Sequence, residues 1–234
     1  VNKIELNKQK QYLEKANLSK IVPIGAAISN IVRLEKKENV IIVNMEEKTT
    51  ITTVYDKQIY NVDIIDAGSE EVLEKINRIE NSMSKAYEIC KGTTIYTSNV
   101  IDDTKEQPYL ETIIPTLYTI AEKVKNTIDE APVKIGTVYL TGTLSAVNNV
   151  DLYFQEILQS TDCKILKPKI IEDTSSQSNI KDFIEVNSAL ALAMQGLGES
   201  IACCKWYSIY PWLIAPHSAN GTVFSPTLVA AIAL

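Results

Sequence analysis

The segment Asn39–Gly68 constrains the fold more than any other part of the chain. It opens on the unbroken β-branched run Val40–Val43, and a strand that is apolar on both faces belongs in the middle of a sheet. The polar turn 45–48 follows that run directly. Because open α/β sheets bind ligands beyond the carboxyl ends of their strands, this turn is the first place to look for a site.

Two more strands are predicted after that turn. Residues 49–55 consist almost entirely of strand-forming types, and a second turn at 56–58 leads into the stretch 59–65. In the last stretch every second residue is apolar and is expected on one face: Tyr60, Val62 and Ile64. Three strands joined by tight turns predict a β-meander with a central first strand.

Composition and charge exclude several classes of function. The chain has 234 residues, 45% hydrophobic and 22% charged, which is ordinary for a globular protein. A net charge of −6 argues against broad nucleic-acid binding, which needs a basic surface. With His217 as the only histidine, and four cysteines without metal-ligand spacing, we expect no metal site. No signal peptide or run of 18 apolar residues is present.

The remaining segments alternate between helix and strand patterns. A strand at 136–142 ends in the turn Gly142-Thr143-Leu144 and leads into a helix at 151–158. A short strand is expected at 163–168. Apolar residues at helical spacing predict further helices at 69–83, 84–90, 109–128 and 183–197. The chain is therefore expected to be α/β.

These motifs, in this order, resemble those of the actin-like ATPase superfamily, and most closely the PilM family of type IV pilus assembly. The resemblance covers roughly residues 5–198. Residues 40–51 are similar to the second phosphate motif, and 138–146 to the adenosine motif. Three further segments match a step after the third strand, a helix end and the closing helix: 65–68, 86–91 and 186–196.

The resemblance implies an actin-like, ribonuclease H-like lobe whose sheet combines the meander with the strand–turn–helix. Residues 39–198 would form the second lobe with its returning helix, and 1–38 the end of the first-lobe insertion and a linking helix. The family's first lobe, with the first phosphate motif, is largely missing. The chain also begins with Val1, which suggests a fragment.

The resemblance also implies a nucleotide site for ATP with Mg²⁺. The positions that match its binding motifs are Asn44, Glu46, Thr49, Thr50, Gly142 and Thr143. Asn44 stands where the family pattern has an acid, and Glu46 stands where it has glycine, so a carboxylate would face the phosphates. At about 4 Å and an effective dielectric near 20, each carboxylate–phosphate pair costs roughly 4 kcal/mol before screening. ATP is therefore expected to bind weakly or not at all.

We assign no catalytic residue and no metal ligand, and a non-catalytic role is favoured over ATP hydrolysis. Gly142 keeps two interpretations: a retained ATP contact, or a turn between strand and helix. Thr143 and Leu144 follow it where close approach to adenosine favours glycine.

By the same resemblance, the chain is a cytoplasmic adaptor of the pilus assembly platform, at the inner face of the cell membrane. Its partners would be a bitopic membrane protein of the PilN kind and other platform proteins, and a homo-oligomer stays open. The alternative is an ATP-binding actin-like switch or an FtsA-like cell-division protein that retains weak nucleotide binding.

The segment 199–234 differs from the rest of the chain. From Ile201 onward only Lys205 is charged, and both tryptophans lie here. Three interpretations stay open: sequence that is not native to the protein, an interfacial segment, or a segment that packs on an apolar groove of the lobe.

Overall fold

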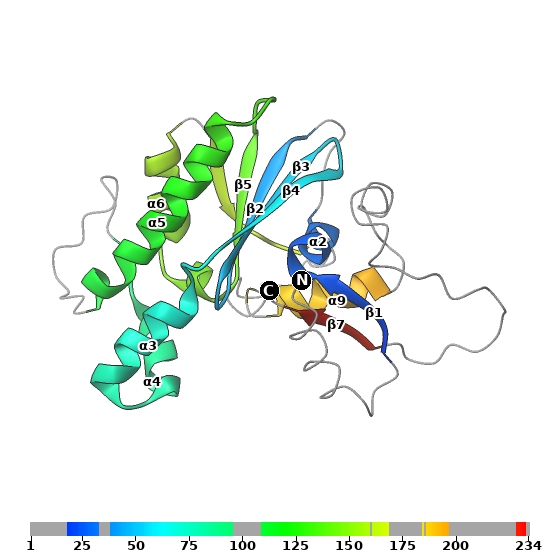
Figure 1. The fold of residues 1–234 in the computed structure, drawn as a ribbon. Coiled ribbons are helices and arrows are strands. Elements are labelled where there is room, and N and C mark those ends of the chain that lie inside the picture. The colour runs from blue at the N-terminus through cyan, green and yellow to red at the C-terminus, as the bar shows by residue number, and fades with distance from the viewer. Residues whose placement is uncertain are drawn as a thin grey trace, which may run out of the picture.

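The protein is a three-layer α/β structure built on one five-stranded sheet (Figure 1). The computed structural model describes residues 18–32, 38–95, 109–159, 161–168, 184, 186–196 and 228–232. The strand order is β4-β3-β2-β5-β6. The five strands are β2 (Val40–Met45), β3 (Thr49–Tyr55), β4 (Gln58–Ile65), β5 (Thr137–Thr141) and β6 (Asp162–Ile165). The α/β fold class and the central position of the first meander strand are confirmed.

The meander forms as predicted, but its third strand does not alternate regularly. Strands β2, β3 and β4 pair antiparallel, and the hairpin between β3 and β4 turns at Asp56 and Lys57, both at positive φ. The register of β3 with β4 shifts near Tyr60. The Tyr60 ring therefore lies 4.7 Å from that of Tyr55 on one face, while Val62 packs on the other. The prediction that Tyr60 and Val62 share a face was wrong because a bulge rotates the strand.

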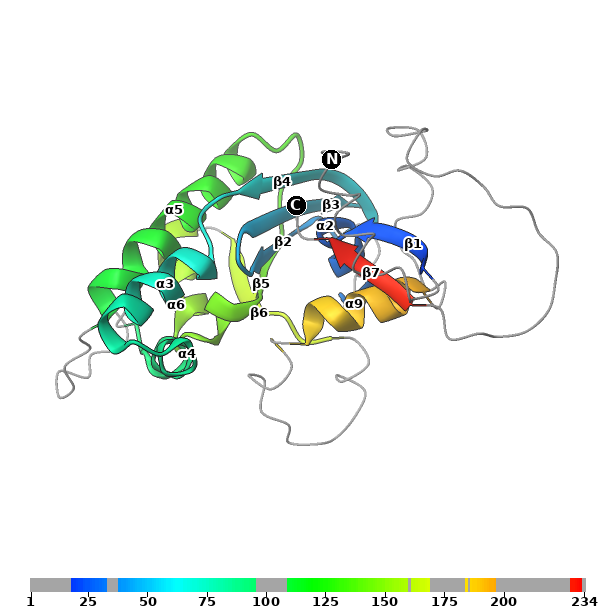
Figure 2. The ribbon, with the colours of Figure 1, turned by 60° about the horizontal axis from the view of Figure 1, so that its bottom comes forward.

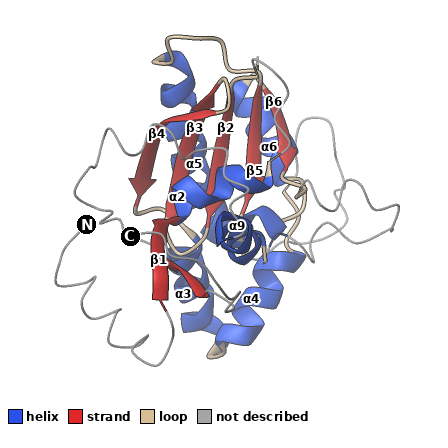
Figure 3. Ribbon diagram, turned by 90° about the vertical axis from the view of Figure 1, so that its right-hand side faces the viewer, coloured by secondary structure: helices blue, strands red, loops and turns tan. Residues whose placement is uncertain are grey.

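Helices cover both faces of the sheet (Figures 2 and 3). One face carries α5 (Leu110–Asp129) and α6 (Val150–Leu158). Two more helices, α3 (Ser69–Glu80) and α4 (Met83–Gly92), extend from its edge. The predicted helix at 69–83 is too long, because Asn81 adopts a left-handed conformation that ends α3 and Ser82 caps α4. Met83, the last residue of the predicted first helix, instead begins the second.

The opposite face carries three short elements close to the carboxyl end of β2. These are α2 (Ile24–Ala27), the 3-10 turn η1 (Ile28–Ile31) and α9 (Asn187–Gly196). The structure describes the expected helix at 183–197 from Asn187 to Gly196. Thr52 donates a hydrogen bond to the Gly25 carbonyl (2.8 Å), and a Cβ at Gly25 would lie 2.5 Å from Val62. Close packing of α2 on the sheet therefore requires glycine there.

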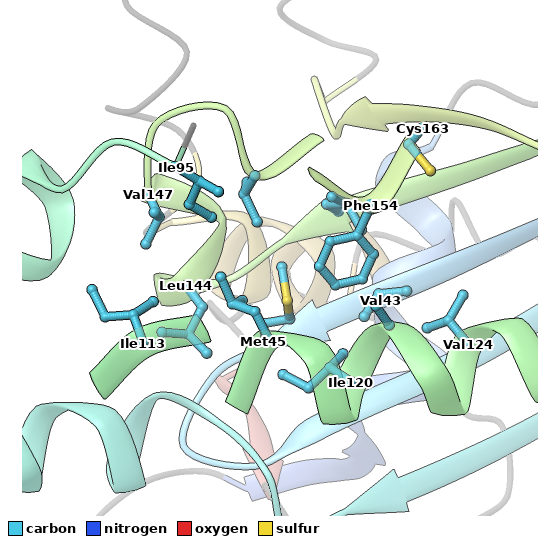
Figure 4. Packing of buried hydrophobic residues seen from close by; sticks show 14 of the residues in the cluster. Val43, Met45, Ile95, Ile113, Ile120, Val124, Leu144, Val147, Phe154 and Cys163 are labelled. Atoms are coloured by element: carbon cyan, nitrogen blue, oxygen red, sulfur yellow. The ribbon is translucent and has the colours of Figure 1, made fainter. Parts of the chain in front are cut away.

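The main core lies between the sheet and helices α5 and α6 (Figure 4). Val43 and Met45 of β2 meet Ile120 and Val124 of α5 and Phe154 of α6, all fully buried. Each such side chain contributes about 1.5–3 kcal/mol through removal of apolar area from water. This core holds β2 rigidly and thereby sets the position of the turn that follows it.

A separate two-stranded sheet joins the beginning of the chain to its end. Strand β1 (Leu18–Pro23) pairs in parallel with β7 (Leu228–Ile232). Of the atypical segment 199–234 the structure describes only this strand. Residues 1–17, part of the predicted first-lobe insertion and linking helix, lie outside the described residues, and the three interpretations of the segment 199–234 stay open.

Candidate functional site

Two turns lie side by side at the carboxyl ends of β2 and β5. The strands are parallel and in register, with Asn44 beside Thr141. The chain leaves β2 through the turn 46–48 and leaves β5 through Gly142 into η2 (Thr143–Ala146). The segments that resemble the second phosphate motif and the adenosine motif therefore meet at the carboxyl ends of these two strands, where open α/β sheets bind ligands.

Gly142 is required by the backbone around it. Its φ is +87°, which side chains rarely allow, and a Cβ here would lie 2.6–2.8 Å from backbone atoms of Met45. The turn between strand and helix therefore needs glycine whether or not a ligand binds. The interpretation of Gly142 as a turn residue therefore has a physical basis in the backbone, and an ATP contact at Gly142 stays a prediction.

The backbone of the turn after β2 is held by the step that follows β4. The Ser69 N–H donates to the Glu46 carbonyl (2.7 Å), and the Thr49 N–H donates to the Ala67 carbonyl (3.1 Å). A Cβ at Gly68 would lie 2.1 Å from the Glu47 carbonyl oxygen. Glycine at position 68 thus lets the segment after β4 contact the turn after β2. This contact fixes the backbone position of Glu46.

The Glu46 carboxylate is the centre of the polar contacts at this edge. Its Oε2 accepts a hydrogen bond from the Thr143 hydroxyl (3.0 Å), and its Oε1 accepts one from the Ser188 hydroxyl (3.3 Å). The Thr143 backbone N–H also donates to it. Burial raises the pKa of Glu46 above its ordinary value, these donors oppose that rise, and the neighbouring Glu47 charge adds to it.

A row of buried polar residues crosses the sheet beneath this carboxylate. In register across β3, β2 and β5 it comprises Thr50, Asn44 and Thr141. The Asn44 amide donates to the Ser188 hydroxyl at a long 3.5 Å, and the Asn187 amide donates to the Thr141 hydroxyl (2.8 Å). The side-chain carbonyls of Asn44 and Asn187 are buried without a hydrogen-bond partner. The row therefore ties the start of α9 to the sheet.

The structure brings together five of the six predicted site residues: Asn44, Glu46, Thr50, Gly142 and Thr143. Thr50 lies in register beside Asn44, and its methyl group would meet a Cβ at Gly25 of α2 at 2.7 Å. Thr49 lies on the opposite face of β3, buried and with its hydroxyl unpartnered.

Sequence reasoning missed Ser188 and Asn187. Both lie in the segment that resembles the closing helix. Nothing in that pattern assigns Asn187 a contact with Thr141, 46 positions away, or Ser188 contacts with Glu46 and Asn44, 142 and 144 positions away. The serine and asparagine at the start of an otherwise apolar helix were the only signal that could have pointed to them.

Two other features of the described residues carry less functional weight. A hollow of about 300 Å³ is lined by the loop 131–135 with Ile128 and Thr161, but it lies before β5, at the opposite end of the strand from the turns. The Cys163 thiol is buried, which raises its pKa to about 12 and makes it a poor nucleophile. Within the described ranges, no group of three or more His, Cys, Asp or Glu side chains could hold a metal ion.

Comparison with known proteins identifies the fold. No family model and no curated protein sequence matches the chain. Among solved structures, a "PilM-PilN type IV pilus biogenesis complex" matches with a TM-score of 0.57 and 15% identity, over 74% of this chain and 51% of that one. MreB5 of Spiroplasma citri bound to ADP matches with a TM-score of 0.55 and 13% identity, over 85% of this chain and 67% of that one.

The fold is actin-like. A second MreB5 structure, bound to AMPPNP, agrees, with a TM-score of 0.53 and 15% identity over 70% of this chain and 60% of that one. The chain spans about half of the PilM-complex chain it matches. The predicted actin-like fold is confirmed. Sequence identities this low support the fold assignment alone. No described helix is both long and apolar enough to cross a membrane.

Proposed function

We propose that this chain is the second lobe of an actin-like adaptor of the type IV pilus assembly platform, which docks a partner instead of cycling a nucleotide. The similarity to the PilM–PilN complex supports the pilus assignment. In this proposal residues 39–198 form the lobe, 1–38 link it to a first lobe, and 199–234 lie outside it.

The observation that carries the non-nucleotide part of the proposal is the position of Glu46. Its carboxylate takes the hydroxyl donors of Thr143 and Ser188, and Glu47 adds a second negative charge to the same turn. A phosphate group placed here would lose those donors and face two carboxylates. At an effective dielectric near 20, one such pair at about 4 Å costs roughly 4 kcal/mol. The residues present therefore do not fit a triphosphate at this turn.

The partner in this proposal is a bitopic membrane protein of the PilN kind, bound at the cytoplasmic face of the inner membrane. The matched solved complex contains a protein of that name. A homo-oligomer is compatible with such a role.

The second candidate is an actin-like switch or an FtsA-like cell-division protein that retains nucleotide binding with Mg²⁺. It is favoured by the MreB5 matches, whose structures hold AMPPNP and ADP. In this candidate Thr49, Thr50 and Gly142 would be the remaining contacts, with Thr49 directly after the turn and Thr50 in register beside Asn44.

A binding assay separates the two candidates. Fluorescence anisotropy of a labelled peptide, the amino-terminal cytoplasmic segment of the PilN-type protein from the same organism, is measured against the full-length gene product. We expect saturable binding that a scrambled peptide lacks and that added Mg-ATP leaves unchanged. Absence of peptide binding, together with tight Mg-ATP binding, would favour the switch and overturn the adaptor.

A further inference from the structure

We propose that the Glu46 carboxylate is a built-in ligand, which occupies an anion site formed by Thr143 and Ser188. A small external anion binds there once that carboxylate is removed. The inference rests on the proposed absence of nucleotide at this turn, but it does not depend on which partner the lobe docks.

The donors come from segments that are distant in sequence and converge on one group. Thr143 supplies its backbone N–H and its hydroxyl from η2, and Ser188 supplies its hydroxyl from the first turn of α9. Both carboxylate oxygens are engaged, one by each side. Two hydroxyls and an amide around one anionic group are the donor types that proteins use for carboxylates and phosphates.

The hydrogen bonds run in one direction toward Glu46. The Asn44 amide donates to the Ser188 oxygen, so the single Ser188 proton is free to point at the carboxylate. An aspartate at position 44 would have no proton to give and would add a like charge two residues from Glu46. The amide at 44 and the carboxylate at 46 therefore form a compatible pair, with the negative charge at the second position.

In the described part of the chain, no positive side chain competes for this carboxylate among the elements that contact it. Neither η2 nor α9 contains a titratable residue, and in the turn itself Lys48 pairs with Asp66 (2.7 Å). Among the residues that the structure describes, Glu47 is the one charged group that acts on Glu46. The site therefore holds the carboxylate through the neutral donors of Thr143 and Ser188. An uncharged acceptor or a free anion in the same place can accept their hydrogen bonds.

Chemical rescue tests the proposal on the whole chain. The E46A variant removes the carboxylate and leaves the three donors, whereas E46Q fills the same space, and E47A removes a charge from the exposed neighbour. The melting temperature of each is followed while acetate or inorganic phosphate replaces chloride at constant ionic strength. We expect both anions to raise the melting temperature of E46A by about 5–11 °C at 100-fold excess over the dissociation constant, which corresponds to about 2.7 kcal/mol.

Wild type and E47A should show no such rise, because the carboxylate already takes the donors. E46Q should show none either, because its amide fills the space that the anion would need. An E46A variant that responds no more than E47A would overturn the proposal, and so would an equal response in wild type. Either result would leave peptide docking untouched, so the two proposals fail separately.

A second measurement covers the case in which E46A does not fold. NMR titration of the Glu46 side-chain carboxyl is carried out in wild type, T143V, S188A and E47A. Loss of either donor should raise the Glu46 pKa, because each donor stabilises the charged form, and loss of the Glu47 charge should lower it. An unchanged Glu46 pKa in both T143V and S188A would refute a carboxylate held by these donors.

Discussion

Replacing Gly142 with alanine should destabilise the lobe through the backbone alone. The new Cβ would sit at φ +87° and lie 2.6–2.8 Å from the N, C and O atoms of Met45. Positive φ costs a non-glycine residue about 1–2 kcal/mol, and contact with rigid backbone adds about 1–3 kcal/mol of overpacking strain. We therefore expect a loss of about 3 kcal/mol in the free energy of unfolding.

Gly92 provides the matched control. It is the last residue of α4, and a Cβ there meets nothing within 4 Å. With about 2–4 °C of melting temperature per kcal/mol for a chain of this size, differential scanning calorimetry should show G142A about 6–12 °C below wild type. G92A should melt at or slightly above wild type, since alanine is the better helix former. A G142A variant within 1 °C of wild type would show that the turn does not approach Met45 as described.

Three further predictions concern the same lobe. Because burial raises the pKa of Glu46, the stability linked to its neutral form is complete below the unfolded value near 4.5 and is lost as pH rises through the folded pKa. In urea denaturation the unfolding free energy of wild type should therefore fall relative to E46Q between pH 4 and 7, and parallel curves would contradict this. N44D places a carboxylate at a position only 1% exposed, so it should cost about 3 kcal/mol or more, and E46Q in the same chain should recover part of that loss. Cys163 should resist iodoacetamide at pH 8 in the native protein, as peptide mapping by mass spectrometry would show; labelling as fast as in urea would refute its burial.

The main sheet could be predicted because its signals are local. The β-branched run of β2 is buried at every position, and polar turns separate β3 from its neighbours on either side. The helical spacing in α5 likewise matches its buried face, which includes Ile113, Leu117 and Ile120. Each of these patterns repeats within one element, so no knowledge of distant contacts was needed.

The bulge in β4 and the polar contacts of α9 could not be predicted, since both depend on partners far along the chain. The bulge is a mismatch between two strands, and neither strand shows it alone. Sequence reasoning expected Glu46 to repel phosphate, but not that Thr143 and Ser188 would hold its carboxylate. Thr49 and Thr50 were grouped as one motif, although alternation along β3 sends them to opposite faces.

Titration of the full-length gene product with Mg-ATP in an isothermal calorimeter tests the central claim most directly. If Glu46 occupies the donors of Thr143 and Ser188, no saturable binding tighter than about 1 mM should appear, which corresponds to roughly 4 kcal/mol. A dissociation constant near 1 μM, or about 8 kcal/mol, would contradict the account. It would mean that the turn opens to nucleotide despite its carboxylate, and that the lobe belongs to a switch.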